Sequence, residues 1–121
     1  MDLATTVYQL SKSMPRDEQY RITSQMLRSA ASVPANIAEG YQRGTRKDYA
    51  HFISIARGSL AETETFLLLA DRAGLLSKGE VAPALEIADE LSRMLNSLRQ
   101  KLTSRPSPLP PHPSPLSKTQ Q

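Results

Sequence analysis

Apolar side chains recur at spacings of three and four residues along four stretches of this 121-residue chain, and that period is typical of amphipathic α-helices. The stretches cover residues 3–14, 17–43, 45–73 and 77–102. Pro15, Gly44 and Gly74 stand between them, where a proline or a glycine ends a helix. No stretch alternates apolar and polar residues for long, so no strand is predicted. The pattern predicts an all-α, antiparallel, up-and-down four-helix bundle with short loops.

Capping residues indicate where the third and fourth helices begin. Thr45 precedes the third apolar stretch, with Asp48 three residues later as a weak capping-box partner. Ser77 and Glu80 have the same spacing before the fourth stretch. Pro83 lies about two turns beyond Ser77, so either this helix begins later or its opening turn is distorted.

The second stretch carries an apolar stripe beside a polar one. The apolar stripe consists of Ile22, Met26, Ala30, Val33, Ile37 and Tyr41. Pro34 lies near the middle of this helix, where it frees the Ala30 carbonyl and costs about 3 kcal/mol relative to a regular helix. We expect a kink at Pro34, with the side chains of Ser29, Ser32 and Asn36 available to bond freed backbone groups.

The polar stripe predicts a hydrogen-bonded network that fixes the register between neighbouring helices. In this network, Glu39 and Glu62 accept hydrogen bonds from arginine, glutamine or serine side chains. The predicted members are Gln25, Arg28, Ser32, Asn36, Glu39, Arg57, Ser59 and Glu62. Such a network can also specify an assembly partner. As an alternative, Glu39, Glu62 and Glu64 could face one another as paired carboxylates for acid–base chemistry.

Two segments of these helices, residues 22–40 and 52–65, closely resemble the bacterial four-helix-bundle family of 23S rRNA intervening-sequence proteins. The resemblance extends over residues 4–102. The accessory variability protein of diversity-generating retroelements, which works beside a reverse transcriptase, is a relative in the same superfamily. The resemblance implies a cytoplasmic, non-enzymatic bundle that forms a homo-oligomeric ring, a pentamer, and that is a candidate for contacts with nucleic acid. It supplies no settled molecular function.

The first helix departs from the pattern of the family that the chain resembles. Family members usually begin with one or two further helical turns that carry a tryptophan, whereas this chain has no Trp and starts at Met1. We therefore expect either that the start codon has been placed too late, or that the protein has a shorter first helix and a less covered core.

The side chains that catalysis or metal binding needs are scarce. The chain has no Cys and two His, which are His51 and His112. A di-metal carboxylate bundle needs two Glu-x-x-His motifs on facing helices, and the nearest approach is the segment from Asp48 to His51. No phosphate-binding glycine loop or serine nucleophile elbow is present. We expect no catalytic site, no metal and no cofactor.

The sequence also bears on where the protein works. Residues 1–3 lack the basic and apolar regions of a signal peptide. The longest strongly apolar stretch, residues 66–70, is too short to span a membrane. We expect a cytoplasmic protein with no membrane partner.

The end of the chain differs in composition from the rest. Residues 103–121 contain six of the nine prolines, and prolines exclude both helix and strand pairing. We expect a bundle over residues 1–102 and a disordered Pro-rich tail after it. The tail has Pro-x-x-Pro spacings, which can dock on an aromatic groove, but we expect a passive tail.

Basic residues gather in the first half of the chain. Residues 16–57 hold seven Lys or Arg against four Asp or Glu, whereas residues 62–102 hold five against seven. Lys and Arg neutralise phosphates without reading the base sequence, and few aromatic residues are available for base stacking. The candidate nucleic-acid-binding residues are Arg43, Arg46 and Lys47 around the Gly44 turn, and then Arg16, Arg21 and Arg28. The alternative is that these charges form ordinary solvated faces.

Four large apolar residues, Phe66 to Leu69, follow one another in the third helix. At 100° per residue they point to nearly every side of that helix, so one bundle core cannot bury them all. This surplus predicts an oligomer interface at Phe66, Leu68 and Leu69.

Two functions remain open from the sequence. One is an oligomeric scaffold that binds RNA or DNA, and the other is a protein-interaction or adaptor module without nucleic-acid binding.

Overall fold

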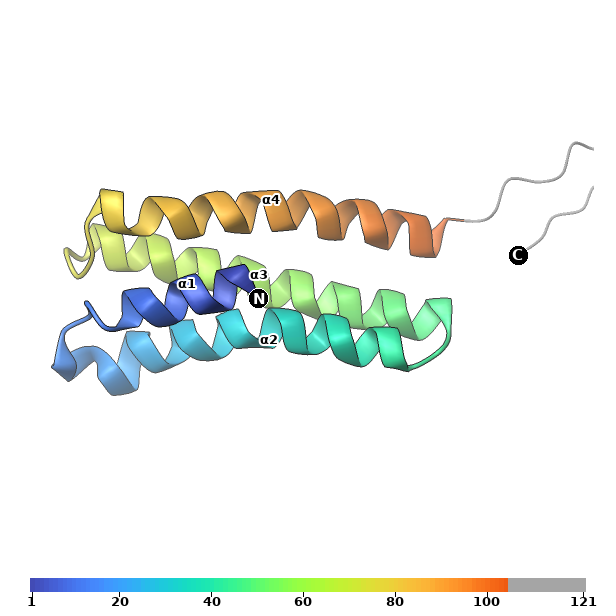
Figure 1. Cartoon of the computed structure of the whole chain (residues 1–121), viewed down its shortest axis with the longest axis horizontal. Coiled ribbons are helices and arrows are strands. Elements are labelled where there is room, and N and C mark those ends of the chain that lie inside the picture. Colours follow the sequence, from blue (N-terminus) through green and yellow to red (C-terminus); the bar gives the residue numbers. More distant parts are fainter. Residues whose placement is uncertain (105–121) are drawn as a thin grey trace, which may run out of the picture.

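The computed structural model describes residues 1–104, apart from the side chains of Gln19 and Tyr20. Its four α-helices run antiparallel to their neighbours and form one elongated bundle (Figure 1). They are α1 (Asp2–Ser11), α2 (Ser24–Gln42), α3 (Arg46–Arg72) and α4 (Lys78–Thr103). The described part of the chain has no strand. The predicted all-α four-helix bundle is therefore confirmed.

The core follows the apolar stripes seen in the sequence. Its largest fully buried apolar side chains are Met26, Ile53, Leu60, Leu67, Val7, Val33 and Val81. Half-buried leucines of α4, such as Leu91 and Leu98, pack against this cluster. None of the helices within residues 1–104 is long and apolar enough to cross a membrane.

The predicted turns and caps at both ends of α3 and at the start of α4 are present. Gly44 and Gly74 have φ values of 87° and 77°, which side chains with a Cβ adopt only with strain. The Thr45 hydroxyl accepts a hydrogen bond from the Asp48 backbone N–H at 3.1 Å. Ser77 and Glu80 form a complete capping box. The start of α4 is therefore at Ser77, and Pro83 lies inside the helix.

The start of the second helix differs from the prediction. The sequence predicted one helix from Asp17 or Glu18 onwards, but a 3₁₀ turn (Arg16–Glu18) and a π-helical turn (Gln19–Thr23) precede α2. Short 3₁₀ turns are common at helix N-termini, and a π turn inserts one extra residue into the helical repeat. The turn places the Thr23 hydroxyl in the interior, where it has no hydrogen-bond partner within the described residues.

Two further predictions concern the middle of the second helix and the end of the bundle. α2 is one continuous helix through Pro34, and the kink there stays a prediction. At the other end of the chain, α4 extends to Thr103, one residue past the predicted domain boundary. From residue 105 onwards, the predicted Pro-rich tail lies outside the described residues.

α2 and α3 share the most extensive interhelical contact in the bundle. They approach closely at Gly40, which is buried. A Cβ atom at Gly40 would lie 2.7 Å from Phe52 Cβ and 3.1 Å from Tyr49 Cδ1. Because real Cβ atoms do not approach other atoms that closely, this crossing requires glycine.

α1 is much shorter than its neighbours and covers only part of the bundle. It has 10 residues, against 27 in α3 and 26 in α4. In Figure 1, α1 lies beside the left half of α2 and α4, so the right-hand end consists of α2, α3 and α4 alone. We call this the three-helix end. It contains the α2–α3 turn and the last turns of α4.

The close approach of α2 and α3 predicts opposite effects for two glycine substitutions. Gly40→Ala should lower the free energy of unfolding by about 1–3 kcal/mol, since Phe52 or the backbone must shift. Gly58→Ala is the matched control, because Gly58 lies in α3 and a Cβ added there would have no atom within 4 Å. This change should stabilise by about 0.5–1 kcal/mol through helix propensity. Urea unfolding followed by circular dichroism measures both, and equal stability of Gly40→Ala and wild type would contradict the packing.

Candidate nucleic-acid interface

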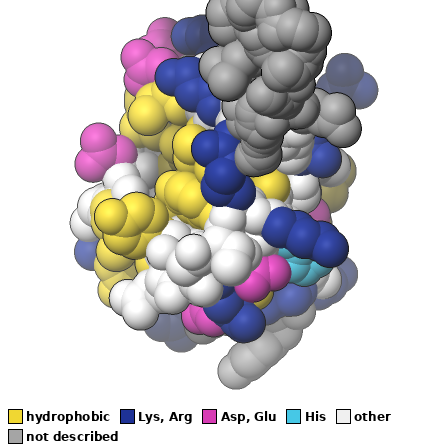
Figure 2. All heavy atoms as spheres, turned by 90° about the vertical axis from the view of Figure 1, so that its right-hand side faces the viewer, with side chains coloured by type: hydrophobic (Ala, Val, Ile, Leu, Met, Phe, Trp, Pro, Cys, Tyr) yellow, Lys and Arg dark blue, Asp and Glu magenta, His cyan; other side chains and the backbone are white. Residues whose placement is uncertain are grey.

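The three-helix end brings together the start of α3 and the end of α4. The two helices are antiparallel, so the first turn of α3 faces the last turns of α4 (Figure 1). A hydrogen bond joins them, in which Arg46 Nη2 donates to the Lys101 carbonyl oxygen at 2.5 Å. Figure 2 views this end of the molecule and shows several Lys and Arg side chains in dark blue, with a histidine in cyan next to them.

A hollow of about 520 Å³ lies between these two helices. It is lined by Arg46, Lys47, Ala50, His51, Ser54, Arg99, Leu102 and Thr103. We call it the basic hollow, because among the described residues every ionisable side chain in its lining is basic and none is a carboxylate. Asp48 adjoins Lys47 in the first turn of α3 but lies outside the lining, so the lining itself presents only cationic or neutral groups, which favour an anionic ligand.

Arg99 is the most firmly held cation of the basic hollow. Its side chain is half-buried, and its Nε donates to the Ser54 hydroxyl at 2.6 Å. This bond uses one of the five guanidinium N–H groups and fixes the direction of the others. The neighbouring Arg46 is held in the same way by its bond to the Lys101 carbonyl.

The remaining predicted nucleic-acid-binding residues lie elsewhere. Arg43 Nε donates to Glu39 Oε2 at 3.0 Å, and its guanidinium carbon lies 4.9 Å from the centre of the Phe52 ring. Arg16 and Arg21 belong to the 3₁₀ and π turns at the opposite end of the bundle (Figure 1). Of the predicted set, only Arg46 and Lys47 line the basic hollow.

Sequence reasoning missed Arg99 and His51 as neighbours of that pair. Arg99 belongs to the mildly acidic second half of the chain, so a count of charges along the sequence gave no reason to select it. The usable signal is the antiparallel arrangement of two helices of nearly equal length, which places the end of α4 beside the start of α3.

The predicted polar network is present only in its central part. The hydroxyls of Ser32 and Ser59 lie 2.8 Å apart, across the contact between α2 and α3. Asn36 Nδ2 donates to the Ser32 hydroxyl and carbonyl oxygens, both at 2.8 Å. One turn away, buried Thr63 lies 2.9 Å from both Ser29 Oγ and the Ser59 carbonyl oxygen. Ser29 and Thr63 were not among the predicted members.

The charged members of the predicted network do not form the hydrogen bonds between helices that we predicted. Arg28 donates to Gln25 on its own helix at 2.8 Å, and Glu39 accepts from Arg43 rather than from Arg28 or Arg57. Within residues 1–104, Arg57 and Glu62 form no side-chain hydrogen bond, and both are exposed. Neighbours one helical turn away compete successfully with partners on another helix, because the backbone already holds them at the right distance.

The three carboxylates considered as an alternative for acid–base chemistry have different surroundings: Glu39 pairs with Arg43, Glu62 is exposed, and Glu64 is half-buried. Burial raises the pKa of the Glu64 carboxyl above its ordinary value, and the negative charge of Asp89 on α4 raises it further. Asp89 itself pairs with Arg93. Across the described chain, no three His, Asp or Glu side chains lie close enough to hold a metal ion.

The predicted oligomer interface divides into exposed and half-buried residues. Leu68 and Leu69 are 49% and 43% exposed, and Ile55 on the same helix is 38% exposed. Phe66 is half-buried and packs against the core of its own bundle. The outer surface of α3 therefore offers the two leucines, with Ile55, for contacts with another chain.

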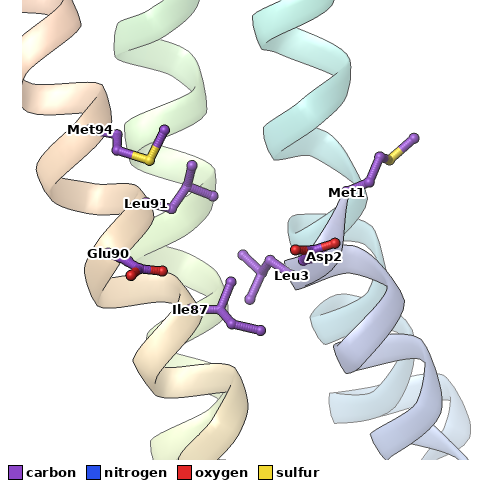
Figure 3. A pocket seen from close by; sticks show the side chains of 7 residues that line it. All are labelled: Met1, Asp2, Leu3, Ile87, Glu90, Leu91 and Met94. Carbon is purple, nitrogen blue, oxygen red and sulfur yellow. The ribbon is translucent and has the colours of Figure 1, made fainter.

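A second hollow, of about 250 Å³, marks the place where α1 begins. Leu3 of α1 and Ile87 of α4 point toward each other there, with Leu91 and Met94 above them (Figure 3). Leu3 is buried, but Met94 is 64% exposed. Leu3 thus covers the core at this place, and Met94 of α4 lies beside it at the surface.

Comparison with known proteins agrees with this architecture. A crystal structure of a protein of unknown function from the S23 ribosomal protein family of Bacteroides thetaiotaomicron VPI-5482 superposes with a TM-score of 0.76. It is 26% identical, and the alignment covers 82% of this chain and 93% of that one. A search of curated proteins finds no match. The family model of the 23S rRNA-intervening sequence protein matches residues 1–97. The chain therefore belongs to the family of 23S rRNA-intervening sequence proteins.

Proposed function

We propose that this protein is a non-enzymatic, oligomeric helical scaffold that binds RNA or DNA without sequence selectivity through its three-helix end. The observation that carries the proposal is the basic hollow, which gathers Arg46, Lys47, His51 and Arg99 from two helices with no carboxylate in its described lining. Family membership is consistent with a role near RNA, since the family is named for a sequence within 23S rRNA.

The charge around the basic hollow supports binding to a polyanion. Residues 39–51 and 96–104 contain five Lys or Arg and two carboxylates, and one of the carboxylates, Glu39, already pairs with Arg43. Charges within a Debye length of about 8–10 Å reinforce one another at physiological salt. Within residues 1–104, the lining of the basic hollow contains no Tyr, Phe or Trp, so the hollow itself favours contacts with phosphates over contacts with bases. Tyr41 and Tyr49 line a neighbouring hollow that shares Arg46 with it.

Removing the two predicted residues that line the hollow should weaken nucleic-acid binding. We expect Arg46→Ala with Lys47→Ala to lower the affinity for RNA and DNA alike, and to reduce the slope of log affinity against log salt by roughly 0.7–0.9 per lost phosphate contact. Fluorescence anisotropy at about 50–200 mM salt measures this slope.

The matched control replaces two arginines at the opposite end of the bundle. Arg16→Ala with Arg21→Ala removes the same charge but should leave both affinity and slope close to wild type. An absence of binding by the wild-type protein at about 100 mM salt would refute the proposal. Equal loss in both double variants would show that net charge matters and the basic hollow does not.

We further propose that the scaffold is a homo-oligomer, with a pentamer expected from the family resemblance. The exposed residues of α3 support a subunit interface. Ile55 and Leu69 are fourteen residues apart and therefore lie on nearly the same side of the helix, about 21 Å apart along its axis. Leu68 is also exposed but points about 100° away from Leu69 around the helix. An assembly would repeat the basic hollow by symmetry and multiply its contacts with one polyanion.

The same apolar surface also fits the alternative function, an adaptor that binds a protein partner. Native mass spectrometry of wild type and of Leu68→Ser with Leu69→Ser separates the two. Because both side chains are exposed, the double variant should keep its helicity while the oligomer dissociates to smaller species. Wild-type protein that is monomeric at micromolar concentration would leave the adaptor as the better interpretation of this surface.

A further inference from the structure

The shape of the basic hollow indicates which phosphate group it fits. A surface that only tracks a nucleic-acid backbone needs cations along a line, because each internal phosphodiester carries one negative charge. The basic hollow instead places basic side chains around one concavity of about 520 Å³. A terminal phosphate monoester carries about −1.5 to −2 charges at pH 7 and three acceptor oxygens on one small group.

Two guanidinium groups of the basic hollow are held in place before any ligand arrives. Ser54 accepts from Arg99 Nε at 2.6 Å, and the Lys101 carbonyl accepts from Arg46 Nη2 at 2.5 Å. Each bond occupies a single donor and leaves further N–H groups on the same planar fork. Guanidinium forks bind phosphate oxygens in pairs, and prior fixation lowers the entropy lost on binding.

The helix ends at this place contribute partial charges of opposite sign. Arg46 and Lys47 are the first two residues of α3, a helix of 27 residues, and its N-terminal turn carries a partial positive charge. The last turns of α4 border the same hollow and carry the partial negative charge of a helix C-terminus, so the positive charge of the basic hollow comes from its side chains. Lys47 and His51 are four residues apart and thus lie on one side of α3, where they line the basic hollow together.

We propose that the basic hollow binds the terminal phosphate monoester of a nucleic-acid strand. Arg99 and Arg46 bind the phosphate oxygens through their guanidinium forks, and Ser54 positions Arg99. Lys47 adds a further positive charge, and His51 offers a ring N–H donor. This inference rests on the proposed binding of nucleic acid at the three-helix end, and it adds recognition of a strand end to non-specific contacts along the strand.

The test compares three single-stranded RNAs of one sequence with an internal fluorophore. One carries a 5′-phosphate, one a 3′-phosphate, and one has hydroxyls at both ends. We expect wild-type protein to bind at least one phosphorylated strand about tenfold more tightly than the hydroxyl strand, the ratio expected for one further charge-assisted contact. Anisotropy titrations at two salt concentrations give the ratio.

Two variants assign the preference to the basic hollow. Arg99→Ala should abolish it, and Ser54→Ala should reduce it, because Ser54→Ala removes the bond that holds Arg99. Ser54→Ala also keeps the test valid if Arg99→Ala does not fold. Arg93→Ala is the matched control, since Arg93 lies on the same helix, pairs with Asp89 and is outside the lining.

The possible results separate this inference from the proposed function. Equal affinity for all three strands overturns the terminal-phosphate site and leaves non-specific binding intact. No binding of any strand overturns both. Adenosine 5′-monophosphate serves as a competitor, and if it binds as tightly as the phosphorylated strand, the ligand is a free nucleotide and the inference is wrong. A preference that persists in Arg99→Ala also overturns the assignment.

Discussion

The close approach of α2 and α3 is the constraint on which the rest of this bundle depends. At Gly40 the two helices are so near that an added Cβ would overlap Phe52. That proximity allows the two helices to be joined by a turn of only three residues, Arg43 to Thr45, in which Gly44 has positive φ. This short loop fixes where α3 begins, and it thereby places Arg46 opposite the end of α4. A packing requirement in the interior thus determines the position of charges on the surface.

The polar groups inside the α2–α3 contact fix the register of the two helices. A hydrogen bond such as that between the buried hydroxyls of Ser29 and Thr63 contributes only about 0.5–1.5 kcal/mol net, but a buried polar group without a partner costs about 1–3 kcal/mol. A shift of one helix along the other would separate both this pair and the half-buried pair of Ser32 and Ser59. The penalty for such a shift exceeds the gain from the bonds themselves. These small hydroxyls therefore discriminate against other registers more than they add stability, and they fit only because the helices are close.

Much of the fold could be predicted from the sequence because helix periodicity and caps are local signals. The Ser77–Glu80 capping box and the Gly44 and Gly74 turns depend on residues within one turn of each other, and all are present. The π turn before α2 could not be predicted, since it depends on how Thr23 and its neighbours pack against the core. The network failed at its charged members for a different reason. Glu39 has a partner one turn away in Arg43, and this i, i+4 spacing, which is visible in the sequence, prevailed over the arginines that we predicted as its donors.

The candidate site was harder to predict than the fold, because its residues come from distant parts of the chain. Arg46 and Lys47 could be selected from their place beside a glycine turn, whereas Arg99 lies in a segment whose overall charge is mildly acidic. α4 has 26 residues, nearly as many as α3, so its C-terminal end reaches the first turn of α3 and brings Arg99 to the site. The short α1 has the complementary effect, since it leaves this end of the bundle as three helices. The lengths of the helices decide which residues meet at each end of the bundle. They therefore determine the chemistry of the site more directly than the local composition of the sequence does.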